Sequence, residues 1–188
     1  YPTIELGNQC WMAKNLNVGE MIEGQLNQSD PDIIEKYCYA NDPLNCDTYG
    51  GLYQWDQAIN YSTDEGTQGI CPEGWHVPTD SEWLELEMFL GASENEANML
   101  NTFRAYGIGT KLKEGGESNM EIMMGGGRNS GGGWQFLEGN SIEFGYFYTS
   151  TENGAYAYRR CLRRDNTGVG RYNNWQKTFG LSIRCVKD

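Results

Sequence analysis

Few residues in this sequence have the types and spacing that catalysis requires. His76 is the only histidine, so a Ser-His-Asp or Cys-His arrangement has one possible base. It lies between Trp75 and Val77, in a short run that is typical of a buried strand. The carboxylate pairs fall on helical patterns and are typical of solvated helix faces, so no two acids are singled out for glycoside hydrolysis. We expect His76 to be a hydrogen-bonded structural residue, and we expect no enzymatic activity.

Metal chemistry has one weak candidate. Asp42, Asn45 and Asp47 carry oxygen ligands that suit calcium, but their spacing lacks the regularity and the closing Glu of an EF-hand. We interpret them as turn-forming residues. The six cysteines form no CxxC pair and no Cys/His spacing typical of zinc, so a disulfide-bearing exported domain is the better interpretation. We expect no metal site and no cofactor.

Basic residues gather near the C-terminus. Residues 153–188 hold eight Lys/Arg and two Asp/Glu, which gives about +6, while the other 152 residues hold six basic and 24 acidic residues, about −18. The total of −12 disfavours nonspecific binding to nucleic acid. The segment 156–164 has the pattern of a strand, which places Arg160 and Leu162 on one face and Arg159, Cys161 and Arg163 on the other.

This uneven charge predicts a binding surface. We expect Arg159, Arg163 and Arg164 to point to solvent, because burying three unpaired guanidinium groups would cost too much. Tyr172 and Trp175 would add rigid aromatic contact area. The predicted ligand-binding residues are Tyr158, Arg159, Cys161, Arg163, Arg164, Asn166, Arg171, Tyr172, Asn173, Asn174 and Trp175.

The best-marked element that positions these residues is a helix over Thr79–Leu90. Thr79 and Glu82 form a capping box, and Trp83, Leu86 and Leu90 fall at helical spacing. A second main helix is predicted over Leu52–Tyr61. Another capping box, at Ser93 and Glu96, predicts a helix that ends near Gly107.

The predicted strands lie mainly at the two ends of the chain. Thr3–Leu6 and Gln9–Leu16 flank a Gly-Asn turn and predict a hairpin. The C-terminal pattern predicts a three-stranded meander of 156–164, 169–175 and 181–186, and the glycine runs near 125 and 131 predict another hairpin. The 25 glycines and 13% aromatic residues favour short strands and ordered loops. With no linker-like stretch, we expect one α+β domain over 1–188, and no apolar run is long enough to span a membrane.

Four separated motifs carry a resemblance to a known family. In order they are GNQCWMAKNLNVG, KYCYANDPLNCDTYGGLYQWDQAINY, GICPEGWHVPTDSEW and FGLSIRCVKD. Together they resemble the major paralogous domain (FISUMP) family of bacterial surface proteins, and GWHVPTDSEW also resembles a segment of the formylglycine-generating enzymes. The resemblance implies a C-type-lectin-like α+β fold, in which the two main helices pack on a small twisted antiparallel sheet with adjacent N- and C-terminal strands.

The resemblance also bears on the cysteines. A local disulfide easily closes the loop between Cys38 and Cys46. A Cys71–Cys185 bond would occupy the place of the long-range disulfide of C-type lectins. Cys10 and Cys161 have no assigned partner. The formylglycine-generating enzymes use two active-site cysteines, whereas this chain has Cys161 alone in the corresponding region, so their oxidase activity is not expected.

The function that follows is non-enzymatic recognition of a protein or an anionic glycan at a bacterial or phage-encoded cell surface or outside the cell. The alternative is an enzyme related to the formylglycine-generating oxidases. Calcium-dependent sugar binding is disfavoured, because the sugar-binding triplets of C-type lectins are absent. Residues 158–175 also resemble the diversified stretch of variable proteins of diversity-generating retroelements. Two interpretations of that stretch stay open: a diversified surface, or a fixed basic face.

Overall fold

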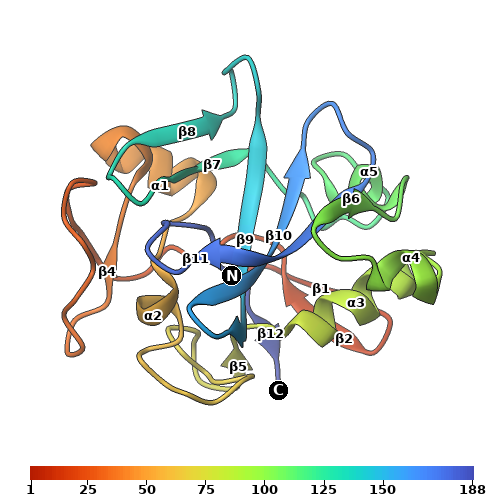
Figure 1. The fold of residues 1–188 in the computed structure, drawn as a ribbon, viewed down its shortest axis with the longest axis horizontal. Helices are drawn as coiled ribbons and strands as arrows, with labels where there is room; N and C mark the ends of the chain where they lie inside the picture. The colour runs from red at the N-terminus through yellow and green to blue at the C-terminus, as the bar shows by residue number, and fades with distance from the viewer.

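The computed structural model describes residues 1–188 as an α+β arrangement of short helices around several β-sheets (Figure 1). The helices are η1 (Tyr39–Asn41), α1 (Pro43–Tyr49), α2 (Trp55–Ala58), α3 (Asp80–Phe89), α4 (Glu94–Asn98) and α5 (Ile108–Leu112). The strands are β1 (Thr3–Leu6), β2 (Gln9–Met12), β3 (Glu20–Met21), β4 (Glu35–Lys36), β5 (Trp75–His76), β6 (Thr102–Arg104), β7 (Gly125–Arg128), β8 (Trp134–Leu137), β9 (Phe144–Asn153), β10 (Tyr156–Arg163), β11 (Val169–Gln176) and β12 (Val186–Lys187).

A four-stranded sheet brings the two ends of the chain together. Its strand order is β1-β2-β12-β5, and Val186 of β12 pairs with Trp11 of β2 and with His76 of β5. The hairpin of β1 and β2 and the strand at His76 are confirmed. The predicted adjacency of the N- and C-terminal strands is also confirmed.

A six-stranded sheet, in the order β6-β11-β10-β9-β7-β8, holds the predicted binding residues. The first two strands of the meander and the β7–β8 hairpin are confirmed. The prediction of 181–186 as the third strand of the meander is wrong, because the strand that lies beside β10 is β9. Leu181 and Ser182 make only isolated bridges, to Tyr53 and Phe147, and the chain then crosses to the four-stranded sheet.

Helix α3 is where the capping box predicts it. The Thr79 hydroxyl accepts a hydrogen bond from the Glu82 amide at 3.1 Å, and Glu82 Oε2 accepts one from the Thr79 amide at 2.7 Å. The second capping box also begins a helix, α4, but that helix ends at Asn98 because the chain then pairs as β6 with β11. The two capping boxes therefore predict where α3 and α4 begin, but not where α4 ends.

Two further helices differ from the predictions. The helix predicted over Leu52–Tyr61 is confined to α2, because the backbones of Leu52 and Tyr53 are engaged in bridges to Tyr37 and Leu181. Helix α1 was not predicted. Pro43 occupies its first position, and the Asp42 carboxylate caps it by accepting a hydrogen bond from the Leu44 amide at 3.0 Å.

The hydrophobic core has two parts. One part includes Trp83 and Leu86 of α3 together with Phe147 and Leu162 of the six-stranded sheet. The other part includes Tyr53, Trp55, Tyr146, Tyr148, Cys161, Leu181 and Ile183. Both predicted disulfides, Cys38–Cys46 and Cys71–Cys185, are present, and Cys10 and Cys161 are free.

Candidate functional site

The two faces of β10 have different chemistry. Arg160 and Leu162 face α3, whereas Arg159 and Cys161 face the second part of the core, as the alternation predicts. In the register with β11, Arg160 lies opposite Arg171 and Arg159 lies opposite Tyr172. The two faces of β10 therefore contact different parts of the protein.

On the α3 face, a buried ion network joins three arginines to two carboxylates. Arg160 bonds Asp80 Oδ1 through Nη1 at 2.5 Å and Glu87 Oε1 through Nε at 2.8 Å. Arg171 Nη2 reaches Asp80 Oδ2, and Arg104 Nη2 reaches Glu87 Oε2, each at 2.6 Å. Burial alone would raise the pKa of Asp80, but Arg171 and Arg160 outweigh it and hold that pKa below its ordinary value. Arg171, predicted to bind ligand, is instead a buried structural residue.

On the opposite face, Arg159 is 4% exposed, so the expectation that it points to solvent is wrong. Its guanidinium carbon lies 3.6 Å from the centroid of the Trp175 ring, 4.6 Å from that of Tyr172 and 4.9 Å from that of Tyr146. No carboxylate pairs with it, and its Nε and Nη1 have no hydrogen-bond partner. Three aromatic faces thus take the place of a counter-ion, a cation–π arrangement that the strand pattern did not reveal.

Cys161 lies beside Arg159 and is also buried, so it does not offer a surface for ligand contact. Burial raises the pKa of its thiol above the ordinary value, although the charge of Arg159 acts in the other direction. A thiol with a raised pKa is a poor nucleophile, because the thiolate is the reactive form. The prediction of Cys161 as a binding residue is corrected: it is a core side chain.

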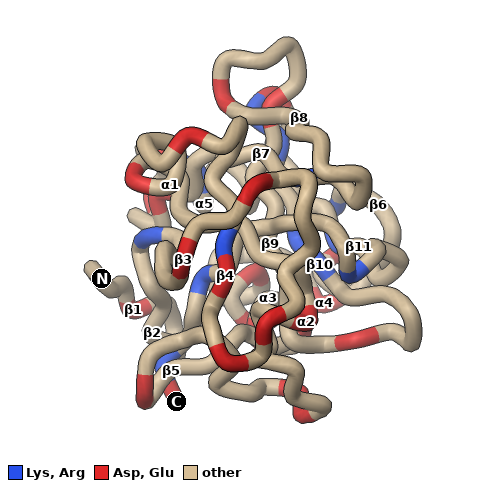
Figure 2. Tube along the Cα trace, turned by 90° about the vertical axis from the view of Figure 1, so that its left-hand side faces the viewer, with Lys and Arg blue, Asp and Glu red and all other residues tan.

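Arg163 and Arg164 do reach the surface, but they are not free cations. Arg163 Nε lies 2.5 Å from Asp165 Oδ1, and Arg164 pairs with both Glu138 and Glu143. These acids lie outside the alternating strand pattern, so the strand pattern alone does not predict the pairing. The C-terminal excess of positive charge is therefore largely compensated within the protein. The side that faces the viewer in Figure 2 carries Asp and Glu on several loops and few Lys or Arg.

Of the other predicted binding residues, some form hydrogen bonds within the protein and some lie at its surface. Asn166 Oδ1 accepts a hydrogen bond from the Gly168 amide at 2.8 Å and shapes the turn between β10 and β11. Asn173 exchanges hydrogen bonds with Asn101 at 3.1 and 3.2 Å. Tyr158 is half-buried on the α3 side, with its ring 5.7 Å from the Arg171 guanidinium, and Asn174 is exposed.

Around Arg159 the surface carries a set of half-buried aromatic rings, which we call the aromatic face. It comprises Phe103, Phe136, Phe144, Tyr172, Trp175 and Phe179. The rings form a chain of contacts: Phe136 to Phe144 at 5.3 Å, and Trp175 to Phe179 at 5.0 Å, with buried Tyr146 between them. The sequence predicted only Tyr172 and Trp175, because the phenylalanines come from β6, β8, β9 and a loop, which only the fold brings together.

His76 has the structural role that the sequence predicts. Its Nδ1 lies 2.8 Å from Asp188 Oδ1, and its Nε2 lies 2.6 Å from Glu82 Oε1. The hydrogen bond to Glu82 raises the pKa of His76, with Asp188 adding to the effect and burial opposing it. His76 therefore links Asp188 to the first turn of α3.

Two whole-chain observations bear on the site. No group of three or more His, Cys, Asp and Glu side chains is arranged to hold a metal ion. None of the helices combines the length and the apolar character that crossing a membrane would require.

Comparison with known proteins identifies the family. The model of the Fibrobacter succinogenes major domain matches residues 4–187, nearly the whole chain, which agrees with the FISUMP resemblance of the four motifs. No curated protein and no solved structure gives a significant match. The chain therefore belongs to the Fibrobacter succinogenes major domain family.

Proposed function

We propose that this protein is a non-enzymatic recognition domain, located outside the cell or on its surface, that binds a protein ligand through the aromatic face. The proposal includes a C-type-lectin-like fold in one domain over residues 1–188. One observation carries it: half-buried rings surround the Arg159 guanidinium, which has no carboxylate partner. Family membership and two disulfides are in keeping with an extracellular location.

The aromatic face has the composition of a binding hot spot. Trp, Tyr and Arg dominate the binding energy of protein interfaces, where they lie in well-packed, desolvated surroundings. Arg159 contacts Trp175 and Tyr172 from beneath, so both rings are held in place before any ligand arrives. Binding then costs less side-chain entropy than it would with freely rotating rings.

The ion pairs at the edge of this face favour a protein over an anionic glycan. Binding of a polyanion needs several uncompensated cations, but Arg163 and Arg164 already face Asp165, Glu138 and Glu143. Paired charges of this kind help to exclude wrong partners and to set orientation more than they add affinity.

The proposal includes sequence diversification of the 158–175 stretch. It is restricted to positions whose side chains are exposed or half-buried, because changes there alter the surface and leave the core intact. Those positions are Tyr158, Arg163, Arg164, Asn166, Tyr172, Asn173 and Asn174. Arg159, Cys161 and Arg171 are excluded because they are buried and packed. Sequencing the same gene from sibling strains tests this: changes at the first set with constancy at the second support diversification, and changes at Arg171 or an invariant 158–175 stretch contradict it.

The binding proposal is tested by capture followed by measurement. The immobilised protein is incubated with surface proteins of neighbouring bacteria, each captured protein is purified, and its affinity is measured for wild type, Trp175→Ala and Tyr172→Ala. We expect at least a tenfold loss for each variant. Tyr106→Ala is the matched control, since Tyr106 is 67% exposed and lies outside the aromatic face.

A further variant distinguishes loss of the binding surface from loss of the folded structure. Asn174→Arg adds bulk at an exposed position beside the aromatic face and removes no core contact. It should weaken binding while the melting temperature stays unchanged. Equal affinity for wild type, Asn174→Arg and Trp175→Ala would place the site elsewhere. Specific binding of sulfated glycans that depends on Trp175 would replace the protein ligand with a glycan.

A further inference from the structure

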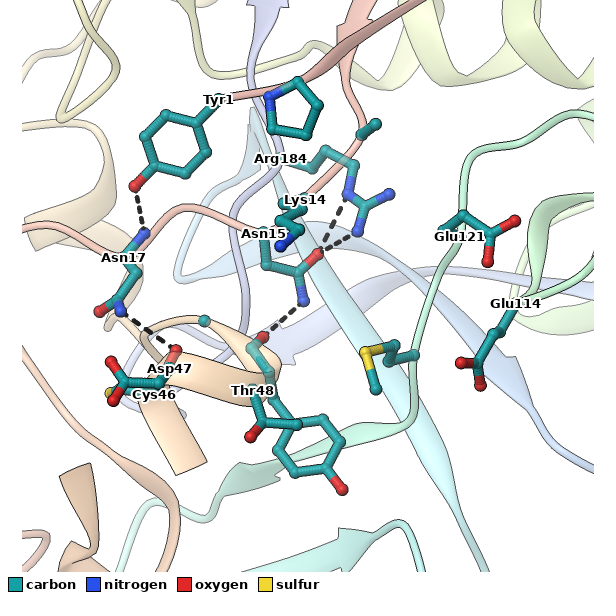
Figure 3. A pocket seen from close by; sticks show the side chains of 15 residues that line it. Tyr1, Lys14, Asn15, Asn17, Cys46, Asp47, Thr48, Glu114, Glu121 and Arg184 are labelled. Carbon is teal, nitrogen blue, oxygen red and sulfur yellow. Dashed lines mark hydrogen bonds between the residues drawn. The ribbon is translucent and has the colours of Figure 1, made fainter. Parts of the chain in front are cut away.

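A cavity of about 560 Å³ lies away from the aromatic face and shares no residue with it. Its walls come from the start of the chain, residues 13–17 after β2, residues 46–50 of α1 and its C-terminus, residues 114–123, and Arg184 (Figure 3). This volume is within the range of small-molecule sites. Segments far apart in the sequence thus converge on one pocket.

The innermost charged group of the pocket is Arg184, which is 2% exposed. Its Nε and Nη2 donate to Asn15 Oδ1 at 3.0 and 2.6 Å, and its Nη1 donates to the Met120 carbonyl. These acceptors are neutral, and no carboxylate lies within ion-pair distance of Arg184. A guanidinium has five N–H groups, so these three hydrogen bonds leave two N–H groups uncommitted.

The charge of Arg184 therefore has no carboxylate partner, and its cation–π contact, with the Phe147 ring, is a distant one at 5.7 Å from the guanidinium carbon. Burial lowers the pKa of Arg184 to about 9, and Glu121 opposes this only in part. Arg160 is buried to the same degree but bonds two carboxylates directly. An anionic group from outside the chain would supply the partner that Arg184 lacks. Lys14, which also lines the pocket and makes no ion pair within the chain, provides a second cation for the same group.

One side of the pocket has the opposite charge. Glu114 and Glu121 both line that side of the pocket, with their carboxylates pointing in different directions (Figure 3). Glu121 Oε2 accepts a hydrogen bond from the Gly115 amide at 3.1 Å, and neither acid forms an ion pair within the chain. Tyr49 and Met123 add apolar surface. The pocket thus offers cations for a carboxylate and carboxylates for a cation.

We propose that this pocket binds a short zwitterionic peptide, with its terminal carboxylate on Arg184 and Lys14 and its ammonium group on Glu114 and Glu121. The pocket shares no residue with the aromatic face, so this proposal can be tested independently of the proposed function. Both charges of the ligand contribute, because each faces an uncompensated charge of the pocket.

The probe is trialanine, titrated into isotope-labelled protein and followed by NMR. We expect saturable shifts at residues 13–17, 46–50 and 114–123. Trialanine amide, which lacks the carboxylate, and N-acetyl-trialanine, which lacks the ammonium group, should each bind at least tenfold more weakly. Equal binding of either capped peptide, or no saturable shift at millimolar peptide, overturns the proposal.

Protein variants separate the two ends of the ligand. Glu121→Gln should weaken binding of trialanine but not of N-acetyl-trialanine, and Lys14→Gln should weaken binding of trialanine but not of its amide. Lys14 is exposed and Glu121 is half-buried, whereas Arg184 is buried, so these variants carry less folding risk than a change of Arg184. Glu85→Gln and Lys187→Gln, both exposed and outside the pocket, are the matched controls. A Lys14 or Glu121 variant that binds both peptides like its control contradicts the assignment.

Discussion

Arg160 Nε donates a hydrogen bond of 2.8 Å to Glu87 Oε1, between two side chains that have no exposed surface. Asp80, Arg104 and Arg171 complete the network around them. The network joins the first and last turns of α3 to β6, β10 and β11. Because three positive charges face two negative ones, the cost of losing a member depends on its sign.

Replacing Glu87 with Gln should be strongly destabilising. It leaves three buried guanidinium groups facing Asp80 alone, and breaking a buried ion pair in this way costs about 3–5 kcal/mol. Urea denaturation at neutral pH measures the change in the free energy of unfolding. The control is Glu85→Gln, exposed on the same helix, for which a change within about 0.5 kcal/mol is expected. Equal stability of the two variants would contradict the structural role of the network.

Arg159→Met should change stability little, by about 1 kcal/mol or less. The substitution loses cation–π contacts worth about 0.5–2 kcal/mol, but it also removes a buried Nε and Nη1 that lack partners, and methionine packs well against rings. Arg160→Met removes hydrogen bonds to two carboxylates, each worth about 1.5–3 kcal/mol. The two variants, compared by urea denaturation, should differ clearly; similar losses would show that the two faces of β10 are not distinct.

His76 should make stability depend on pH. Its folded-state pKa is raised above 6.5, chiefly by Glu82, so its contribution is complete below about pH 6.5 and is lost as the pH rises through the folded-state value. Glu82 has a lowered pKa, so its contribution is present above pH 4.5 and is lost as the pH falls through the folded-state value. We expect His76→Gln to flatten the alkaline side of a stability profile measured from pH 5 to 9. An unchanged alkaline slope would show that His76 does not titrate with folding.

The two disulfides should contribute unequally. Their cysteines are 8 and 114 residues apart, and the loop-closure estimate gives about 2.5 kcal/mol for Cys38–Cys46 and about 5 kcal/mol for Cys71–Cys185. Paired Cys→Ser variants, compared by denaturant unfolding, check this order. A larger loss for the Cys38/Cys46 variant would mean that local packing outweighs chain entropy.

Removal of divalent metal should leave the melting temperature unchanged. Asp42 caps α1, and Asn45 Nδ2 donates to the Tyr39 carbonyl at 2.9 Å, so these side chains already have partners inside the chain. Differential scanning calorimetry with and without a chelator measures the effect. A drop that added calcium reverses would assign a calcium site to the acidic residues of this segment.

Local signals in the sequence predict much of the fold. The capping boxes at Thr79 and Ser93 require only residues three apart, and both begin helices where expected. The hairpin of β1 and β2 is equally local. The predicted helix boundaries are wrong where the backbone pairs with residues distant in the sequence. Leu52 and Tyr53 form β-bridges with Tyr37 and Leu181, and α2 is shorter than predicted for that reason.

The candidate site was harder to predict. Strand alternation correctly separates Arg159 from Arg160, but it does not show what covers either face. Arg159 is covered by rings from two neighbouring strands, and Arg160 by carboxylates 73 and 80 residues away. The sequence places Asp80 in the first turn of a helix, where the helix dipole favours a negatively charged side chain. The ion pairs of Asp80 with Arg160 and Arg171 depend on how α3 packs on the sheet, which the sequence does not show.

The Cys71–Cys185 bond also decides how the molecule carries mechanical force. If the protein is stretched by its two ends, the tension passes directly from residue 71 to residue 185 through the sulfur atoms. The 114-residue span between the two cysteines therefore cannot be extended by the force. At about 3.5 Å per residue, the intact disulfide makes the fully stretched chain roughly 400 Å shorter than the reduced chain. Every ring of the aromatic face lies within that span, so a pull on the chain ends bypasses the strands that hold the face together.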